Sequence, residues 1–412
     1  MSDARTPLIT PVLLAGSLIL ILSFGIRASF GVFQIPIAAL HGWERSEFSF
    51  AIAIQNLAWG FGQPLFGALA ERIGDRKSVT LGALLYAGGL VLSSYAITPG
   101  QYQALEILVG FGIAGIGFGT ILALIGRAAP AEHRSLSLGL ATAAGSVGQV
   151  IGPLVTQALL TRVSLATIFV IFAGVILASL SMLPFLKAPS VAHHTEPAES
   201  LRAVVRRAFS DPSFIMIFVG FFSCGYQLGF ITAHFPALVT EVCGAINPTG
   251  PLAALGISTT SALGAASIAL IGIANICGTV TAGWLGKRYS KKYLLAGVYL
   301  MRTIISAAFI LNPVTPATVI LFSLSMGTLW LATVPLTSGL VAQIYGVRYM
   351  GTLYGIVFFS HQLGSFIGVW LGGWMYDLYG SYTAVWWIGI GVGAFSALVH
   401  LPVEERPLAL RA

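Results

Sequence analysis

Arg27, Arg302 and His361 are ionisable side chains inside apolar stretches of this sequence, and their types define the chemistry to expect. Arg27 lies near the middle of the apolar run 12–39, and Arg302 and His361 lie inside later runs. An ionisable group at the centre of a membrane span costs at least about 2.5–3.5 kcal/mol, so it indicates a function or a specific partner. An arginine without a carboxylate partner is a binding group for anions. We therefore expect anion binding at Arg27.

His361 offers a second kind of chemistry, because a histidine titrates near neutral pH and can both hold an anion and accept a coupled proton. Each of the three residues also has a structural interpretation. Arg27 can be held by backbone carbonyls near two glycines, and His361 can be a neutral histidine in helix packing. For Arg302 the expected role is structural anchoring to a carbonyl or to Tyr299, one turn earlier.

Neutral polar and aromatic side chains in other apolar runs complete a candidate binding site. Gln227 is favoured among them because it lies 200 residues after Arg27, and the chain contains an internal repeat with that offset near the start of each half. Any one of these groups is more often a hydrogen bond between helices than a ligand contact. The candidate substrate-binding residues are Arg27, His361, Gln227, Asn275, Tyr226, Asn56, Gln149, Trp330 and Phe359.

The elements that must position these residues are membrane-spanning helices. The 412-residue chain is 56% hydrophobic and 8% charged, with a mean hydropathy of +0.88, whereas a soluble domain is about a quarter charged. Apolar runs near the roughly 20-residue length that crosses a bilayer recur throughout. They predict an all-α integral membrane protein with spans near 12–39, 47–70, 78–97, 101–128, 135–161, 165–186, 213–241, 257–285, 293–311, 316–344, 350–376 and 382–401.

The spans form two copies of one module. Glycines at 139, 148 and 152 recur at 355, 364 and 368, an offset of 216, and near the start of each half the offset is 200. Internal repeats of this kind are typical of secondary transporters. We expect two pseudo-symmetric six-helix bundles, over 1–186 and 212–412, joined by a cytoplasmic linker at 187–211.

The positive charges predict the orientation of these spans. Of the 21 Lys and Arg residues, 17 are predicted on the same side of the membrane as both termini. Only Arg45 and Arg162 are predicted on the opposite side, and Arg27 and Arg302 lie within predicted spans. Positive residues concentrate on the cytoplasmic side of membrane proteins. We expect a multi-pass protein of the cell inner membrane with both termini in the cytoplasm. The net charge of +7 is then a topology signal, and nucleic acid is not an expected partner.

A glycine- and charge-rich stretch follows the second span, and a weaker copy begins at Gly283. The first copy fits the pattern G-x-x-x-[DE]-[RK]-x-G-x-[RK]-[RK] and resembles the motif between spans two and three of the major facilitator superfamily. That resemblance implies a gate in which the glycine lets spans two and eleven approach and the acid pairs with a basic group. The residues assigned to this gate are Gly67, Glu71, Arg72, Gly74, Arg76 and Lys77.

A narrower resemblance concerns two stretches. Phe30–Phe33 and His133–Gly148 are similar to the monocarboxylate-transporter group, with bacterial oxalate/formate-exchanger-like carriers nearby. That group carries a lysine in the first span, and Arg27 stands one residue from its aligned position. The group's acid and arginine of span eight are replaced here by Asn275 and Thr279.

The expected function is alternating-access transport of a small organic anion, a mono- or dicarboxylate, by proton symport or anion exchange. The competing classes are a drug/proton antiporter and a sensor that has lost transport. Gly148–Pro153 resembles half of an antiporter signature, but Glu106 stands only five residues into its span, and no carboxylate is expected deep in the membrane. The lack of an expected acid in the middle of the membrane therefore favours the anion carrier.

Other activities find no support in the residue pattern. The sequence has no phosphate-binding Gly-Lys-Ser/Thr loop and no nucleophile–base arrangement, so neither an enzyme nor a cofactor is expected. His193 and His194 adjoin in the linker without the ligands that would complete a metal site. Cys224, Cys243 and Cys277 are expected to be packing residues. The expected partners are a small organic anion and the lipid bilayer, with the chain acting as a monomer.

Overall fold

The helices alone account for the architecture of the chain. The computed structural model describes residues 8–43, 45–160, 162–187 and 200–408. His193 and His194 lie outside these residues. The described elements are α1 (Pro11–His41), α2 (Arg45–Ile73), α3 (Asp75–Ser93), α4 (Pro99–Ile116), α5 (Phe118–Ala128), α6 (Arg134–Leu160), α7 (Leu165–Ala178), the 3₁₀ helix η1 (Ser179–Phe185), α8 (Leu201–Ser210), α9 (Pro212–Val242), α10 (Pro251–Ala254), α11 (Thr260–Arg288), α12 (Lys291–Ile310), α13 (Pro316–Leu329), α14 (Thr333–Tyr345), α15 (Met350–Tyr379) and α16 (Thr383–His400).

These elements form the twelve predicted crossings, with α4 and α5, α7 and η1, and α13 and α14 each sharing one crossing. By length and composition, ten of the segments in the described ranges are apolar enough to span a membrane. Helices α2 and α3 are not among these ten, although their lengths of 29 and 19 residues are near that of a membrane crossing. Six crossings lie in each half of the chain. The predicted all-α fold of twelve membrane helices in two bundles is confirmed.

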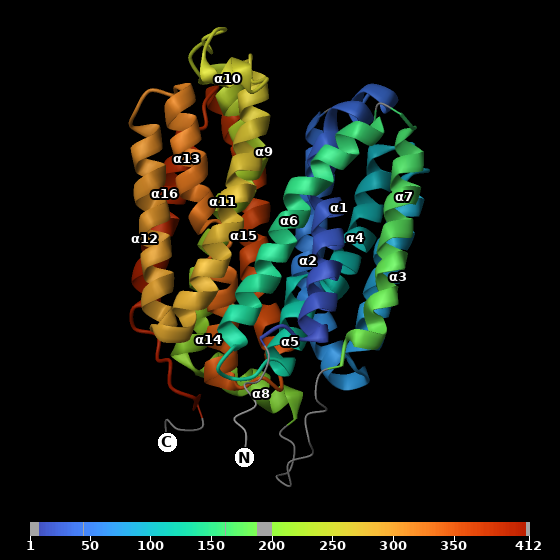
Figure 1. The fold of residues 1–412 in the computed structure, drawn as a ribbon, viewed down its shortest axis with the longest axis vertical. Coiled ribbons are helices and arrows are strands. Elements are labelled where there is room, and N and C mark those ends of the chain that lie inside the picture. Colours follow the sequence, from blue (N-terminus) through green and yellow to red (C-terminus); the bar gives the residue numbers. More distant parts are fainter. Residues whose placement is uncertain (1–7, 44, 161, 188–199, 409–412) are drawn as a thin grey trace.

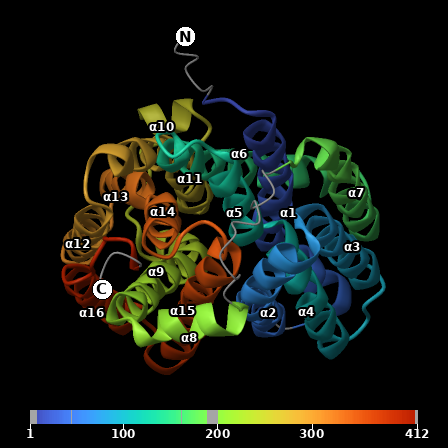
Figure 2. The same ribbon diagram turned by 90° about the horizontal axis from the view of Figure 1, so that it is seen from below.

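The two bundles stand side by side with α8 across one end (Figures 1 and 2). The N-terminal bundle runs from α1 to η1 and the C-terminal bundle from α9 to α16. We call the end at which α8 lies the linker end; α10 lies at the opposite end. In Figure 1 the bundles converge towards the linker end and diverge towards the opposite end.

Glycines make the contact between the bundles close. A Cβ atom added to Gly67 on α2 would lie 2.3 Å from the backbone of Gly351 on α15, and one on Gly139 of α6 would lie 3.0 Å from the Cα atom of Gly283 on α11. Residues 67 and 283 are related by the 216-residue repeat. The interface at the linker end is therefore built twice from the same module, once as α2 against α15 and once as α6 against α11.

Two crossings are interrupted at corresponding places. The fourth breaks at Gly117, whose backbone is extended between α4 and α5, and the tenth breaks between Leu329 and Thr333. These positions differ by about the repeat offset. Interrupted helices at matching positions of two inverted or related repeats are the best backbone indicator of a transporter's binding region. The fold thus indicates where the site lies before any side chain is considered.

Candidate functional site

Arg27 lies in the N-terminal bundle beside the first helix break. Its NH2 group donates a hydrogen bond of 2.8 Å to Oδ1 of Asn56 on α2, and its guanidinium carbon lies 4.7 Å from the centre of the Trp59 ring. Its Nε atom is buried without a hydrogen-bond partner. The side chain is thus held by a neutral amide and an aromatic face, which leaves its positive charge available.

Trp59 connects this arginine to the other bundle. Its ring centre lies 4.9 Å from that of Phe358 on α15, and its Nε1 atom donates a hydrogen bond of 2.9 Å to Gln63. Gln63 in turn donates to the carbonyl oxygen of Ala114, which the helix break leaves free. Polar side chains commonly satisfy backbone groups freed by such breaks in membrane helices. Two predicted residues, Arg27 and Asn56, are therefore brought together at the contact between the bundles.

Asn275 plays the matching structural role in the C-terminal bundle. Its Oδ1 atom accepts a hydrogen bond of 2.8 Å from the backbone N–H of Leu331, inside the second helix break, and its Nδ2 atom donates to Ser146 of the opposite bundle at 2.7 Å. Both polar atoms of this fully buried side chain are thereby engaged. Trp330, the first residue after α13, is buried at the same break. Asn275 holds the break and the interface together.

His361 is buried near the Phe358 contact. Its ring lies 5.1 Å from Phe358 and 5.0 Å from Phe221, its Nδ1 atom is 3.0 Å from Oε1 of Gln362, and its Nε2 atom has no hydrogen-bond partner. It is 7% exposed. The residue therefore lies within the C-terminal bundle, one aromatic layer from the Trp59–Phe358 contact.

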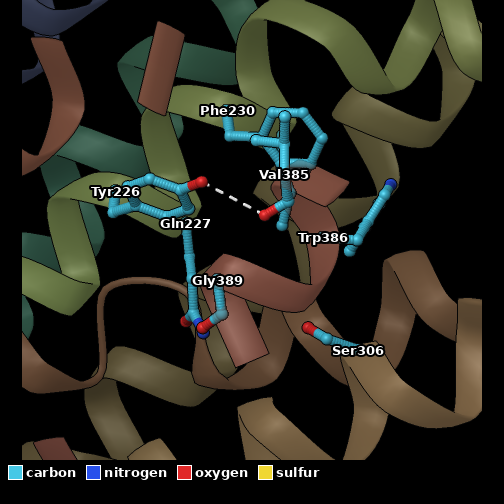
Figure 3. A pocket seen from close by; sticks show the side chains of 8 residues that line it. Tyr226, Gln227, Phe230, Ser306, Val385, Trp386 and Gly389 are labelled. Atoms are coloured by element: carbon cyan, nitrogen blue, oxygen red, sulfur yellow. Dashed lines mark hydrogen bonds between the residues drawn. The ribbon is translucent and has the colours of Figure 1, made fainter. Parts of the chain in front are cut away.

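Gln227 and Tyr226 lie elsewhere, which corrects the expectation drawn from the repeat. Gln227 donates to the carbonyl oxygen of Gly389 at 3.0 Å, and the Tyr226 hydroxyl donates to that of Val385 at 3.1 Å. Both side chains face α16 and line a small cavity with Trp386 (Figure 3). The repeat offset therefore does not bring the Gln227 side chain beside Arg27 in this structure, and its role in substrate binding stays a prediction.

Two further candidates are only partly buried. The Phe359 ring packs at 4.7 Å against Phe61 of α2, which is exposed, whereas the neighbouring Phe358 faces Trp59. Adjacent helical residues point about 100° apart, so Phe359 lies at the edge of the α2–α15 contact. Gln149 is partly buried on α6.

Glu106 is a buried carboxyl group that the sequence analysis placed near the membrane surface. It is 0% exposed on α4, and its Oε2 atom accepts a hydrogen bond of 2.6 Å from Gln55. Gln55 adjoins Asn56, the partner of Arg27. Glu106 lies in the first half of α4, as the sequence indicated, but its carboxyl group is enclosed by the bundle because α2 and α3 pack around this part of the helix. The indicative signal was the polar pair Gln55–Asn56 on α2.

The residues predicted to form a gate lie at the linker end, but their partners differ from those expected. Glu71 accepts hydrogen bonds from the backbone N–H and the hydroxyl of Thr352, at 3.0 and 2.6 Å, in the first turn of α15. The first turn of a helix has free N–H groups and partial positive charge. The acid thus binds the start of a helix in the other bundle rather than a basic side chain.

The basic residues of the motif do not bridge the bundles. Arg76 donates to the carbonyl oxygens of Pro184 and Leu186, at the end of η1 in its own bundle. Arg72 and Lys77 are exposed. Gly74 has φ +96°, a backbone conformation that side chains disfavour, which explains its place in the turn before α3.

Asp75 supplies an ion pair that the motif did not predict. Its carboxylate pairs with Arg127 at the end of α5, and the neighbouring Gly126 lies against Met350 of α15. Asp75 therefore joins the start of α3 to α5, next to the contact of α5 with α15. Within the described ranges, no group of three or more His, Cys, Asp and Glu side chains is placed to hold a metal ion.

Comparisons with known proteins agree with this architecture. The family model of the major facilitator superfamily matches residues 15–369 and 243–411. The chain is 24% identical to the uncharacterised MFS-type transporter YcxA of Bacillus subtilis, covering 91% of this chain and 90% of that protein, and 25% identical to monocarboxylate transporter 13 of Rattus norvegicus, covering 92% and 86%. Its fold resembles that of FucP, the fucose:proton symporter of E. coli, with a TM-score of 0.72, 16% identity, and coverage of 96% and 98%.

The family match covers the chain and confirms the membership that the 67–77 motif indicated. Relatives of this kind carry small molecules across membranes and are not enzymes. The two bundles, the paired helix breaks and the interface between them are the parts that such a protein needs. The chain belongs to the major facilitator superfamily and is a multi-pass membrane transporter.

Proposed function

We propose that this transporter carries a small organic anion, a mono- or dicarboxylate, and that Arg27 binds its carboxylate between the bundles. One observation carries the proposal: Arg27 lies at the Trp59–Phe358 contact with a neutral partner, Asn56, and a buried Nε that has none. Among the described residues, no ion pair joins Arg27 to a carboxylate. A similar protein is named a monocarboxylate transporter, which supports an anionic substrate.

The transport cycle follows from the interface. We assign the linker end to the cytoplasm, because Lys and Arg concentrate there. The Gly67–Gly351 contact is then the closed cytoplasmic gate of a carrier open to the outside. Rocking of the bundles about the substrate would open that gate. Proton symport and anion exchange both fit this cycle.

Ligand-dependent thermal unfolding tests the proposal. The panel contains monocarboxylates, dicarboxylates, lipophilic cations and neutral sugars, and the proteins are wild type, Arg27→Gln and Arg162→Gln. Arg162 is exposed at the opposite end, so its variant controls for the loss of one charge. A ligand at 100 times its Kd stabilises the folded protein by about 2.7 kcal/mol. We expect a carboxylate to stabilise wild type and Arg162→Gln but not Arg27→Gln; equal stabilisation of all three proteins would overturn the proposal.

The buried Glu106 supports one alternative, a drug/proton antiporter. A protonatable carboxyl group inside the bundle can exchange a proton for a cationic substrate. In that case lipophilic cations, and not carboxylates, would stabilise the wild type, and Glu106→Gln would abolish the effect. The same panel therefore separates the two functions.

A further inference from the structure

A second buried arginine lies in the C-terminal bundle. Arg302 is 0% exposed, although α12 lies at the rim of the bundle (Figure 2). Its guanidinium carbon is 5.9 Å from the centre of the Tyr299 ring, but its NH1 group donates its hydrogen bond to the sulfur of Cys224 on α9, at 3.4 Å. The Nε and NH2 groups have no partner. Of the two expected anchors, a carbonyl or Tyr299, the structure thus contains the contact with Tyr299.

Cys224 lies at the centre of a polar cluster inside this bundle. The thiol is fully buried, and its sulfur is 3.2 Å from the Thr333 hydroxyl on α14. The titratable groups around it come from three helices. They are Arg302 and Tyr299 of α12, His361 and Tyr354 of α15, and His400 of α16, whose ring stacks on that of Tyr299 at 5.1 Å. The ionisable groups of α11 lie elsewhere: Lys287 and Arg288 are at its linker end, and Cys277 is exposed.

This cluster has a fixed positive charge and unpaired hydrogen-bond donors. A guanidinium stays protonated in proteins, and a buried charge requires a compensating charge. Among the described neighbours of Cys224 none is a carboxylate. A thiol is a stronger acid than the phenols of Tyr299 and Tyr354, whose hydroxyls have no hydrogen-bond partner. The group best suited to compensate Arg302 is therefore the Cys224 thiolate, which can accept hydrogen bonds from both Arg302 and Thr333.

Building on the proposed anion transport, we propose that Cys224 and Arg302 form a thiolate–guanidinium pair and that Cys224 is the proton-binding group of the carrier. The step is a simple protonation: one proton joins the sulfur and an S–H bond forms. The cluster then carries one uncompensated positive charge, which favours an anion between the bundles. Anion and proton therefore bind together, and each raises the affinity for the other by the same factor.

His361 provides the connection between the two sites. Its ring neighbours the Cys224 thiol and stacks on Phe358, which contacts Trp59 beneath Arg27. Its Nε2 atom lacks a hydrogen-bond partner, so it is available to pass a proton. In this scheme His361 relays the proton, and Cys224 holds it.

Infrared spectroscopy tests the pair without any transport assay. The protein carries Cys243→Ser and Cys277→Ser, so that the S–H stretching band reports on Cys224 alone, and Cys224→Ser in the same background provides the blank. We expect no S–H band at neutral pH, a band on acidification, and a band at neutral pH in Arg302→Gln. Arg302→Lys also removes the arginine but keeps the positive charge, so the S–H band should stay absent. This variant shows whether the band in Arg302→Gln comes from the lost charge or from a folding defect. An S–H band at neutral pH in the parent protein would overturn the proposal.

A binding experiment tests the coupling. The affinity for the best carboxylate of the thermal panel is measured across pH for the parent and for Cys224→Ser. We expect the affinity of the parent to rise by about 5–150-fold towards acidic pH, the range of typical coupling, and that of Cys224→Ser to stay constant. Identical pH profiles for the two proteins would refute the role of Cys224. Failure of every carboxylate to bind the parent would instead refute the proposed function, while the infrared result would stand independently.

Discussion

Replacing Gly67 by alanine should open the linker end of this transporter. The added Cβ would lie 2.3 Å from the carbonyl carbon and oxygen of Gly351. Because those atoms are backbone, no side-chain rotation can relieve the overlap, and α2 and α15 must separate. Gly88 on α3 has no atom within 4 Å of its added Cβ, so Gly88→Ala is the matched control.

The size of the expected shift between the closed and open linker ends follows from the cost of overpacking the α2–α15 contact. Forcing an extra methyl group into a packed contact costs about 1–3 kcal/mol. The gain in helix propensity from glycine to alanine, about 1 kcal/mol, applies equally whether the bundles touch or not, and therefore cancels between the two states. The equilibrium between closed and open linker ends should shift by about 5–150-fold towards the open state.

Distances between spin labels measure this shift. Labels at the exposed positions Arg72 and Arg348 report on the linker end, and labels at Arg162 and Leu255, also exposed, report on the opposite end. We expect Gly67→Ala to lengthen the first distance and shorten the second, and Gly88→Ala to change neither. If Gly67→Ala has the same distance distributions as the wild type, the glycine contact does not control the gate.

Two further variants probe the same interface. Glu71→Gln removes the charge that binds the first turn of α15 and should favour the open linker end by about 1 kcal/mol, measured with the same labels. An unchanged distribution would mean that the Thr352 contact is incidental, and Lys77→Gln, at an exposed position nearby, is the control. Asn275→Ala leaves the Leu331 N–H unsatisfied and should lower the free energy of unfolding by about 1–3 kcal/mol, as measured by thermal unfolding. Asn312→Ala, at an exposed position, is the control and should lower it little. Equal effects of the two variants would show that the second helix break does not depend on Asn275.

The sequence predicted the crossings well because ten of the described segments are long and apolar enough to span a membrane. It did not predict the partner of Glu71, because that partner is a backbone group at the start of a distant helix and exists only once α2 and α15 are in contact. It misplaced Gln227 because the direction of a side chain is set by its helix neighbours. It did not predict the break after Leu329, because the residues Trp330–Ala332 carry no glycine or proline.

The Trp59–Phe358 contact beside Arg27 and the Gly67–Gly351 contact of the proposed gate lie on the same two helices, α2 and α15. On α2, Trp59 and Gly67 are eight residues apart, or about 12 Å along the helix, and on α15 Phe358 and Thr352 are six residues apart, or about 9 Å. A ligand that separates Trp59 from Phe358 must tilt α2 against α15, and the backbone contact at Gly67 leaves no room to absorb that tilt. The proposed binding at Arg27 should therefore shift the Glu71–Thr352 contact through the rigid helices α2 and α15. This coupling requires only that both contacts lie on one pair of helices.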